Sequence, residues 1–173
     1  MAILEILEYP DPRLREVAKP VGEITDEIRT LVDSMAETMY DAPGVGLAAT
    51  QVGVNLRIFI IDIAGEDEPS DLKVFINPEL FDADGVQVYK EGCLSFPGAT
   101  EDIKRAETIK VRARDISGKA FELEAEGLMA VALQHENDHL NGVLMIDKLN
   151  AFQRRKMGQK LARARSEEAT SNQ

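Results

Sequence analysis

The sequence predicts a single α+β domain in which mostly antiparallel sheets pack around a helix that carries the pattern His-Glu-x-x-His. Three observations lead to this class. Strand-like segments come first, two of them alternate apolar and polar residues on either side of a turn, and the His-Glu-x-x-His helix comes late. The chain of 173 residues fits one core. We place the domain at residues 1–165, with a C-terminal helix at about 147–165, and expect a disordered tail at 166–173.

Local patterns predict the elements in chain order: a proline-rich turn at 9–12, a helix at 25–41, strands at 57–63, 73–78 and 85–89, a strand pair at 108–114 and 120–124, a helix at 126–141 and the final helix. Thr25 or Asp26 can cap the first helix. Ser117-Gly118 marks the turn between the paired strands. Asn141-Gly142 is a plausible end for the helix before it.

Composition limits the classes of function. No window approaches the roughly 18 apolar residues of a membrane span, and the N-terminus carries acids where a signal peptide carries Lys or Arg. A single cysteine excludes an internal disulfide, so we expect a cytoplasmic protein. The net charge of −11 argues against broad binding to nucleic acid. Residues 148–165 are locally basic, which fits either a solvated helix face or contact with RNA.

The pattern His-Glu-x-x-His spans His135 to His139, and these two residues are the only histidines of the chain. On a helix they lie one turn apart on the same face, so both rings can bind one metal ion. Glu136 can then act as general base toward a metal-bound water. The pattern is short and also occurs by chance on amphipathic helices. A metal site needs a further protein ligand.

Spacing tests three plans for that ligand. A metzincin protease would have a histidine at position 145, but this residue is Met145. A thermolysin-like site would use a downstream glutamate as its third ligand. The only glutamates after His139 are Glu167 and Glu168, which lie in the predicted tail. Cys93 remains. A lone cysteine is often a small buried hydrophobe, but a Cys-His-His set would leave one coordination position open for water, as catalytic sites do.

Three segments resemble the signature motifs of peptide deformylase, in the order of that family: Gly44-Val45-Gly46-Leu47-Ala48-Ala49-Thr50-Gln51, Glu91-Gly92-Cys93-Leu94-Ser95 and Gln134-His135-Glu136-Asn137-Asp138-His139-Leu140. Residues 9–15 and 105–107 also match sequences that are typical of the family. The likeness covers about residues 3–150. It implies the deformylase fold and removal of the N-formyl group from the initiator methionine of new polypeptides, with release of formate.

The resemblance also implies roles for individual residues. Cys93, His135 and His139 would hold one divalent metal, Fe²⁺ as the physiological ion, with Zn²⁺, Ni²⁺ or Co²⁺ as substitutes. A metal-bound water or hydroxide would attack the formyl carbon, with Glu136 as general acid and base. The side-chain amide of Gln51 and the backbone N–H of Leu94 would stabilise the oxyanion. By its residues alone, Gln51 could equally be a solvated loop side chain.

Partners follow from the same resemblance. N-formylmethionyl nascent peptides would bind along the small residues near Gly46, which composition alone also allows to be a flexible loop. Val45, Leu128, Val131 and Tyr89 are candidates for the methionine slot, although ordinary core packing selects the same types. Many deformylases carry an arginine after the cysteine motif, and residues 96–101 contain none. The basic helix would contact the ribosome, and we expect a monomer.

Two other classes of function stay open at this level. One is a zincin-type metallopeptidase, which the lack of a further histidine or a well-placed glutamate disfavours. The other is a non-catalytic metal-binding protein. An acid at Glu136 and an amide at Gln51, beside a site with an open coordination position, favour catalysis over a structural metal.

Overall fold

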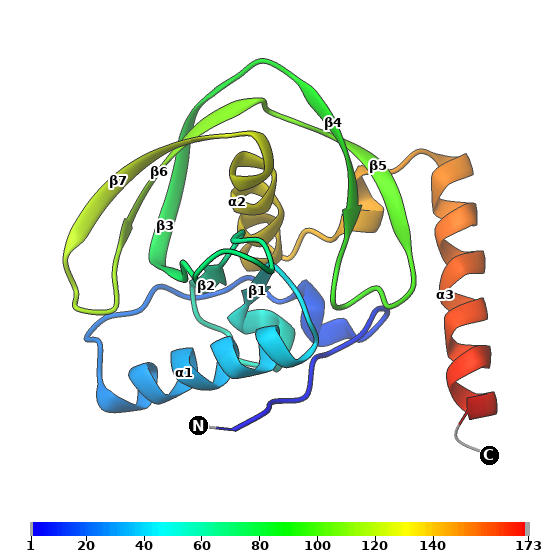
Figure 1. The fold of residues 1–173 in the computed structure, drawn as a ribbon, viewed down its shortest axis with the longest axis horizontal. Coiled ribbons are helices and arrows are strands. Elements are labelled where there is room, and N and C mark those ends of the chain that lie inside the picture. Colours follow the sequence, from blue (N-terminus) through cyan, green and yellow to red (C-terminus); the bar gives the residue numbers. More distant parts are fainter. Residues whose placement is uncertain (1, 172–173) are drawn as a thin grey trace.

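The computed structural model describes residues 2–171 (Figure 1). Its elements are, in chain order, the 3₁₀ turn η1 (Pro12–Arg15), α1 (Asp26–Asp41), β1 (Gly46–Ala48), η2 (Ala49–Val52), β2 (Ile58–Ile61), β3 (Lys73–Asp84), β4 (Gln87–Gly92), β5 (Thr100–Arg105), β6 (Thr108–Arg114), β7 (Ala120–Glu126), α2 (Gly127–Leu140), η3 (Met145–Lys148) and α3 (Ala151–Ser171).

The strands form two antiparallel sheets, which confirms the predicted α+β class. A five-stranded sheet has the order β1-β2-β3-β6-β7, and β4 pairs with β5 in a second sheet of two strands. The predicted hairpin is confirmed, with Asp115 Oδ1 accepting the Ser117 N–H at 2.9 Å in its turn. Both sheets are therefore available to enclose the helix that follows β7.

The central helix α2 lies between the two sheets (Figure 1). Its apolar face packs into the main core, where Ala130 and Leu133 meet Phe59, Phe75 and Val111. Each of these side chains is fully buried. Burial of such groups stabilises a fold by about 25 cal/mol per Å² of apolar surface, so α2 is held rigidly. The helix that carries both histidines is therefore anchored in the main core.

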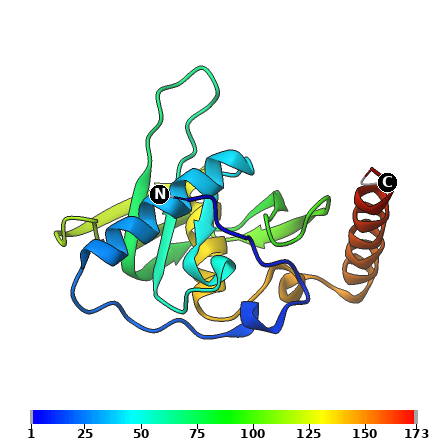
Figure 2. The same ribbon diagram turned by 90° about the horizontal axis from the view of Figure 1, so that it is seen from below.

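The first helix, α1, covers the other face of the five-stranded sheet. Thr25 caps it, because the Thr25 Oγ1 accepts the N–H of Ile28 at 3.3 Å. Met35 and Met39 pack from α1 onto Leu47 of β1 and Ile60 of β2. Figure 2, seen from below, shows the loop between β2 and β3 projecting away from this body. The predicted bounds of α1 are confirmed to within a residue.

Several strands differ from the prediction. No strand was predicted where β1 lies, and β4 spans Gln87–Gly92 instead of 85–89. The strand predicted at 73–78 continues as β3 to Asp84, because Asn77 adopts a positive φ of 54° and its side chain bonds both the N–H and the carbonyl of Val21, which lets the chain pass Pro78 within the sheet. Strand β5 was not predicted. Its inward positions are Glu101, Ile103 and Arg105, and two buried charges hide the apolar alternation that marks a strand.

The C-terminal helix also differs. It begins at Ala151 rather than near 147, because Asn150 caps it: Asn150 Oδ1 accepts the Gln153 N–H at 2.8 Å and Gln153 Oε1 accepts the Asn150 N–H at 3.1 Å. It continues to Ser171, so the prediction of a disordered tail from 166 was wrong for 166–171, which contain no glycine or proline to end the helix. Residues 172 and 173 of that predicted tail lie outside the described residues.

No helix within residues 2–171 combines the length and the apolar character needed to cross a membrane.

Candidate active site

Three donor atoms converge between α2 and the end of β4. His135 and His139 lie one turn apart on α2, and their Nε2 atoms are 3.3 Å apart. Cys93 follows directly after β4, and its Sγ lies 3.3 Å from His139 Nε2. Ligand atoms of all three residues lie within 4.8 Å of one another. A thiolate and two imidazoles suit zinc or ferrous iron, so this donor set fits a divalent cation.

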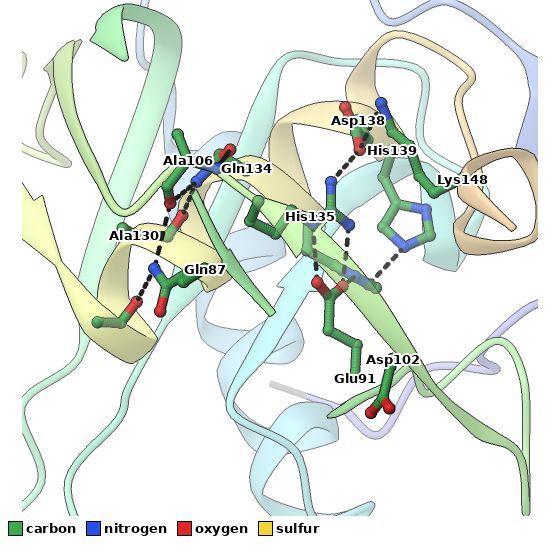
Figure 3. Close-up of polar contacts among 12 residues, drawn as sticks. Gln87, Glu91, Asp102, Ala106, Ala130, Gln134, His135, Asp138, His139 and Lys148 are labelled. Carbon is green, nitrogen blue, oxygen red and sulfur yellow. Dashed lines mark hydrogen bonds and ion pairs between the residues drawn. The ribbon is translucent and has the colours of Figure 1, made fainter. Parts of the chain in front are cut away.

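Glu91 orients the first of these histidines. Its Oε1 lies 2.9 Å from His135 Nδ1, so that nitrogen donates its proton and leaves Nε2 free for a metal (Figure 3). Arg105 grips the same carboxylate, with Nε donating to Oε2 at 2.7 Å and Nη2 to Oε1 at 2.9 Å. Burial would raise the pKa of Glu91, but the Arg105 and His135 contacts outweigh it and lower that pKa. Glu91 therefore stays ionised.

Their surroundings shift the pKa values of the two histidines in opposite directions. Burial and the neighbouring charge of His135 lower the pKa of His139 well below its usual value, so the His139 ring is neutral with a lone pair available. Burial also acts to lower the pKa of His135, but the negative charges of Cys93 and Glu91 outweigh it and raise that pKa well above the usual value. A site that attracts a proton so strongly through its anions also attracts a metal cation.

Glu136 lines the same cavity as Cys93 and His135. Its side chain is buried, with 4% exposure, and its Oε1 bonds to no group within residues 2–171. Burial raises the pKa of Glu136 to about 7. A Cβ at Gly46 would lie 2.5 Å from Glu136 Oε2, so only glycine at position 46 leaves room for this carboxylate. Glu136 is thus a carboxylate without a hydrogen-bond partner, and its pKa lies near neutral pH, where a general base is most effective.

Gln51 presents its amide nitrogen to the donor group. Its Oε1 accepts the N–H of Ala48 at 2.9 Å, which fixes which end of the amide carries the nitrogen. The Nε2 donates to Ser95 Oγ at 3.0 Å and lies 3.6 Å from Cys93 Sγ. The alternative of a solvated loop side chain is wrong, since Gln51 is only 1% exposed. Among residues 2–171, no acceptor takes the backbone N–H of Leu94.

A cavity of about 710 Å³ opens onto these groups. Every residue predicted from the sequence for substrate or oxyanion contact lines it: Val45, Gly46, Gln51, Tyr89, Leu94, Leu128 and Val131. Cys93, His135 and Glu136 also line it, whereas His139 does not and is 1% exposed. The sequence motifs, far apart in the chain, therefore meet around one space.

Sequence reasoning missed several residues around this space. Glu91 stood in a quoted motif but received no role, although its place two residues before Cys93 on β4 puts it on the inward face. Arg105 and Ser95 likewise lie in segments that match the family, but the sequence assigns no role to either. Residues 96–101, after the cysteine motif, contain no arginine. In this segment the backbone carbonyl of Thr100 accepts a hydrogen bond from Lys160 Nζ of α3 at 2.6 Å.

Known proteins resemble this chain in sequence over most of its length. The family model for polypeptide deformylase matches residues 3–155. A peptide deformylase of Alkalilimnicola ehrlichii is 57% identical over 161 residues, covering 93% of this chain and 90% of the relative. The chain belongs to the polypeptide deformylase family. A deformylase of Cellvibrio japonicus is 56% identical over 162 residues, covering 93% of this chain and 95% of its own.

Solved deformylase structures share the whole fold. A crystal structure of a peptide deformylase from Legionella pneumophila has a TM-score of 0.92 and 46% identity, covering 97% of this chain and 98% of its own. A deformylase from Synechococcus elongatus in complex with actinonin has a TM-score of 0.87 and 40% identity, covering 94% of this chain and 88% of its own. Membership identifies this chain as a metal-dependent hydrolase that removes the formyl group from nascent peptides.

Proposed function

We propose that this deformylase acts at the Cys93, His135 and His139 group, with Glu136 as its general acid and base. The observation that carries this assignment is the position of Glu136. It is a buried carboxylate with an unpartnered oxygen and a pKa of about 7, and it lies beside the only cluster of three metal-ligating donors found within residues 2–171. This combination suits proton transfer to and from a reacting group at neutral pH.

Cys93 Sγ and the two histidine Nε2 atoms would hold the metal. A divalent cation bound there would supply a water of lowered pKa and Lewis acidity toward the formyl oxygen. Ferrous iron is the ion that the family favours, and zinc, nickel or cobalt suit the same donors. Glu91 keeps the Nε2 of His135 directed at this point through the contact at its Nδ1.

Glu136 takes the proton of the attacking water and later gives it to the departing amine. Its freedom from other partners matters, because a carboxylate that already accepted hydrogen bonds would be a weaker base. Gln51 Nε2 and the N–H of Leu94 donate to the oxyanion that forms on the formyl oxygen. Ser95 Oγ supports Gln51 in this role, since it accepts from the same amide nitrogen at 3.0 Å.

The peptide would enter between two strand edges. Strand β1 is the outer strand of its sheet, and β4 pairs only with β5, so each has an edge open to an added strand. Gly46 of β1 and Tyr89 of β4 both line the cavity. An extended formyl peptide would pair along these edges, with its methionine side chain against Val45, Leu128 and Val131.

N-formylmethionyl nascent peptides are the substrates, and we infer a cytoplasmic monomer. The ribosome contact through α3 would use Arg155 and Arg163, because most other basic residues of this helix contact the body: Lys156 and Lys160 reach Glu101, and Arg165 donates to the Tyr9 carbonyl. Unchanged ribosome binding after reversing the charge of Arg155 and Arg163 would contradict it.

The function is tested by measuring formate released from a formyl-Met-Ala-Ser peptide by anaerobically purified or nickel-loaded protein. We expect release from the formylated peptide and no cleavage of the unformylated one, which a metallopeptidase would attack. Glu136→Ala should retain its metal and lose turnover by about 100-fold or more. Full activity in Glu136→Ala would refute the mechanism. Unaltered metal content and affinity in Cys93→Ser would remove Cys93 as a ligand.

A further inference from the structure

A chain of buried charges runs from His135 across the back of α2. Arg105 binds Glu91 through two parallel contacts and also donates from Nη1 to Asp138 Oδ2 at 2.6 Å. The side chains of Arg105 and Glu91 are 4% and 3% exposed, and Asp138 is 21% exposed. Lys148 Nζ lies 3.9 Å from the same Asp138 Oδ2 (Figure 3). One guanidinium thus joins two carboxylates, and one of these holds His135.

The three residues come from three different elements. Glu91 lies on β4, Arg105 ends β5, and Asp138 lies on α2 immediately before His139. Strand β4 leads directly into Cys93, whereas α2 carries both histidines. The proposed donor set is therefore split between two elements, and the Arg105 side chain bonds to both of them, through Glu91 of β4 and Asp138 of α2. A change in that contact changes where Cys93 lies relative to the histidines.

Simple docking of α2 does not require Arg105. Gln134 already ties α2 to the residue after β5, because its Oε1 accepts the Ala106 N–H at 2.9 Å and its Nε2 donates to the Ala106 carbonyl at 3.0 Å. Neither contact involves a residue bonded to a donor of the site. The Glu91 carboxylate, in contrast, has both oxygens engaged by Arg105 and cannot turn away from His135.

We infer that Arg105 is a positioning residue of the metal site: through Glu91 it fixes the ring of His135, and through Asp138 it fixes the spacing between Cys93 and the two histidines. This inference rests on the proposed metal site. Arginine suits the task because its planar fork grips one carboxylate at two points and still reaches a second. A lysine here would keep the charge and lose the fork.

The test measures binding of Co²⁺ by competition with a chelator, using the full chain under anaerobic conditions. Arg105→Lys should weaken Co²⁺ binding by about 10- to 100-fold and shift the visible absorption bands of the bound Co²⁺. Arg57→Lys is the matched control. Arg57 also bonds α2, with its Nη2 donating to Asn137 Oδ1 at 3.2 Å, but it bonds neither to the three donor residues nor to Glu91. We expect unchanged Co²⁺ affinity and spectrum in Arg57→Lys.

A double-mutant cycle separates positioning from general stability. If Arg105 acts through Glu91, Arg105→Lys should change Co²⁺ affinity less than about threefold in a Glu91→Gln background, because the linkage is already lost. Equal effects in both backgrounds, or unchanged affinity and spectrum in Arg105→Lys, would overturn the inference. If Arg105→Lys does not fold, Asp138→Asn takes its place, and unchanged affinity there would overturn it too. Wild-type protein that fails to bind Co²⁺ would refute the metal site itself.

Discussion

The reaction centre and the substrate cavity share a boundary but hold their residues in different ways. In the centre, His135, Glu136 and His139 are 8%, 4% and 1% exposed, and ion pairs and hydrogen bonds fix what surrounds them. In the cavity wall, Val45 and Tyr89 are 47% and 39% exposed. The chemistry depends on fixed geometry, whereas the wall must admit a peptide. Changes in the centre should therefore alter kcat, and changes in the wall should alter KM.

The largest effect tests the oxyanion donor. Gln51→Ala should lower kcat on the order of 100- to 1,000-fold with little change in KM, because a donor to the transition state is lost. The measurement is steady-state formate release from a formyl-Met peptide. Gln153→Ala is the control, since Gln153 bonds to Asn150 and to β5, away from the cavity. A kcat within threefold of wild type in Gln51→Ala would place the oxyanion elsewhere.

The next prediction tests the space beside Glu136. Gly46→Ala should lower kcat on the order of 100-fold, because the new Cβ would lie 2.5 Å from Glu136 Oε2 and displace the base. Gly22→Ala is a matched control, since a Cβ there meets nothing within 4 Å. Unaltered kcat in Gly46→Ala would mean that Glu136 works from another position.

A smaller effect is expected from the wall. Leu128→Ala should raise KM for formyl-Met peptides by about 10-fold and leave kcat almost unchanged, because it removes apolar contact made equally in the ground state and the transition state. The neighbouring Met129 packs into the main core and does not line the cavity. Met129→Ala should therefore lower stability without raising KM. A lower kcat in Leu128→Ala would contradict the separation of roles between the reaction centre and the cavity wall.

The smallest effect lies outside both regions, at the Arg15–Asp147 ion pair. Burial acts to raise the pKa of Asp147, but bonds from Arg15 and the Leu144 N–H outweigh it and leave that pKa below its ordinary 3.8. The pair thus stabilises the fold above the unfolded pKa, and this contribution is lost as pH falls through the folded pKa.

Solvent screening limits the contribution of this pair to about 1 kcal/mol or less at neutral pH. Urea unfolding of metal-depleted protein should show a smaller loss of stability between about pH 5 and about pH 3 for Asp147→Asn than for wild type. An identical acid dependence in both proteins would show that the contact contributes nothing.

The sequence by itself determined the class of fold and the identity of the main groups. A helical spacing of His135 and His139, the alternation at 108–114 and the hairpin turn at Ser117-Gly118 are local patterns, and the structure has each of them as predicted. The spacing of the histidines predicted the role of Glu136 as a base. The roles of Cys93 and Gln51 came from the resemblance to the deformylase motifs, because a lone cysteine can be a small buried hydrophobe and a glutamine a solvated loop side chain.

Only the tertiary structure decided how these groups are supported. Strand β5 escaped prediction because Glu101 and Arg105 are buried charges, and a buried charge is recognisable only once its partner is in place. The same holds for Glu91, whose grip on His135 depends on an arginine 14 positions away in the chain. Local patterns report on neighbours in sequence, whereas the orientation of a ligand depends on neighbours in space, and these are chosen by packing of the whole fold.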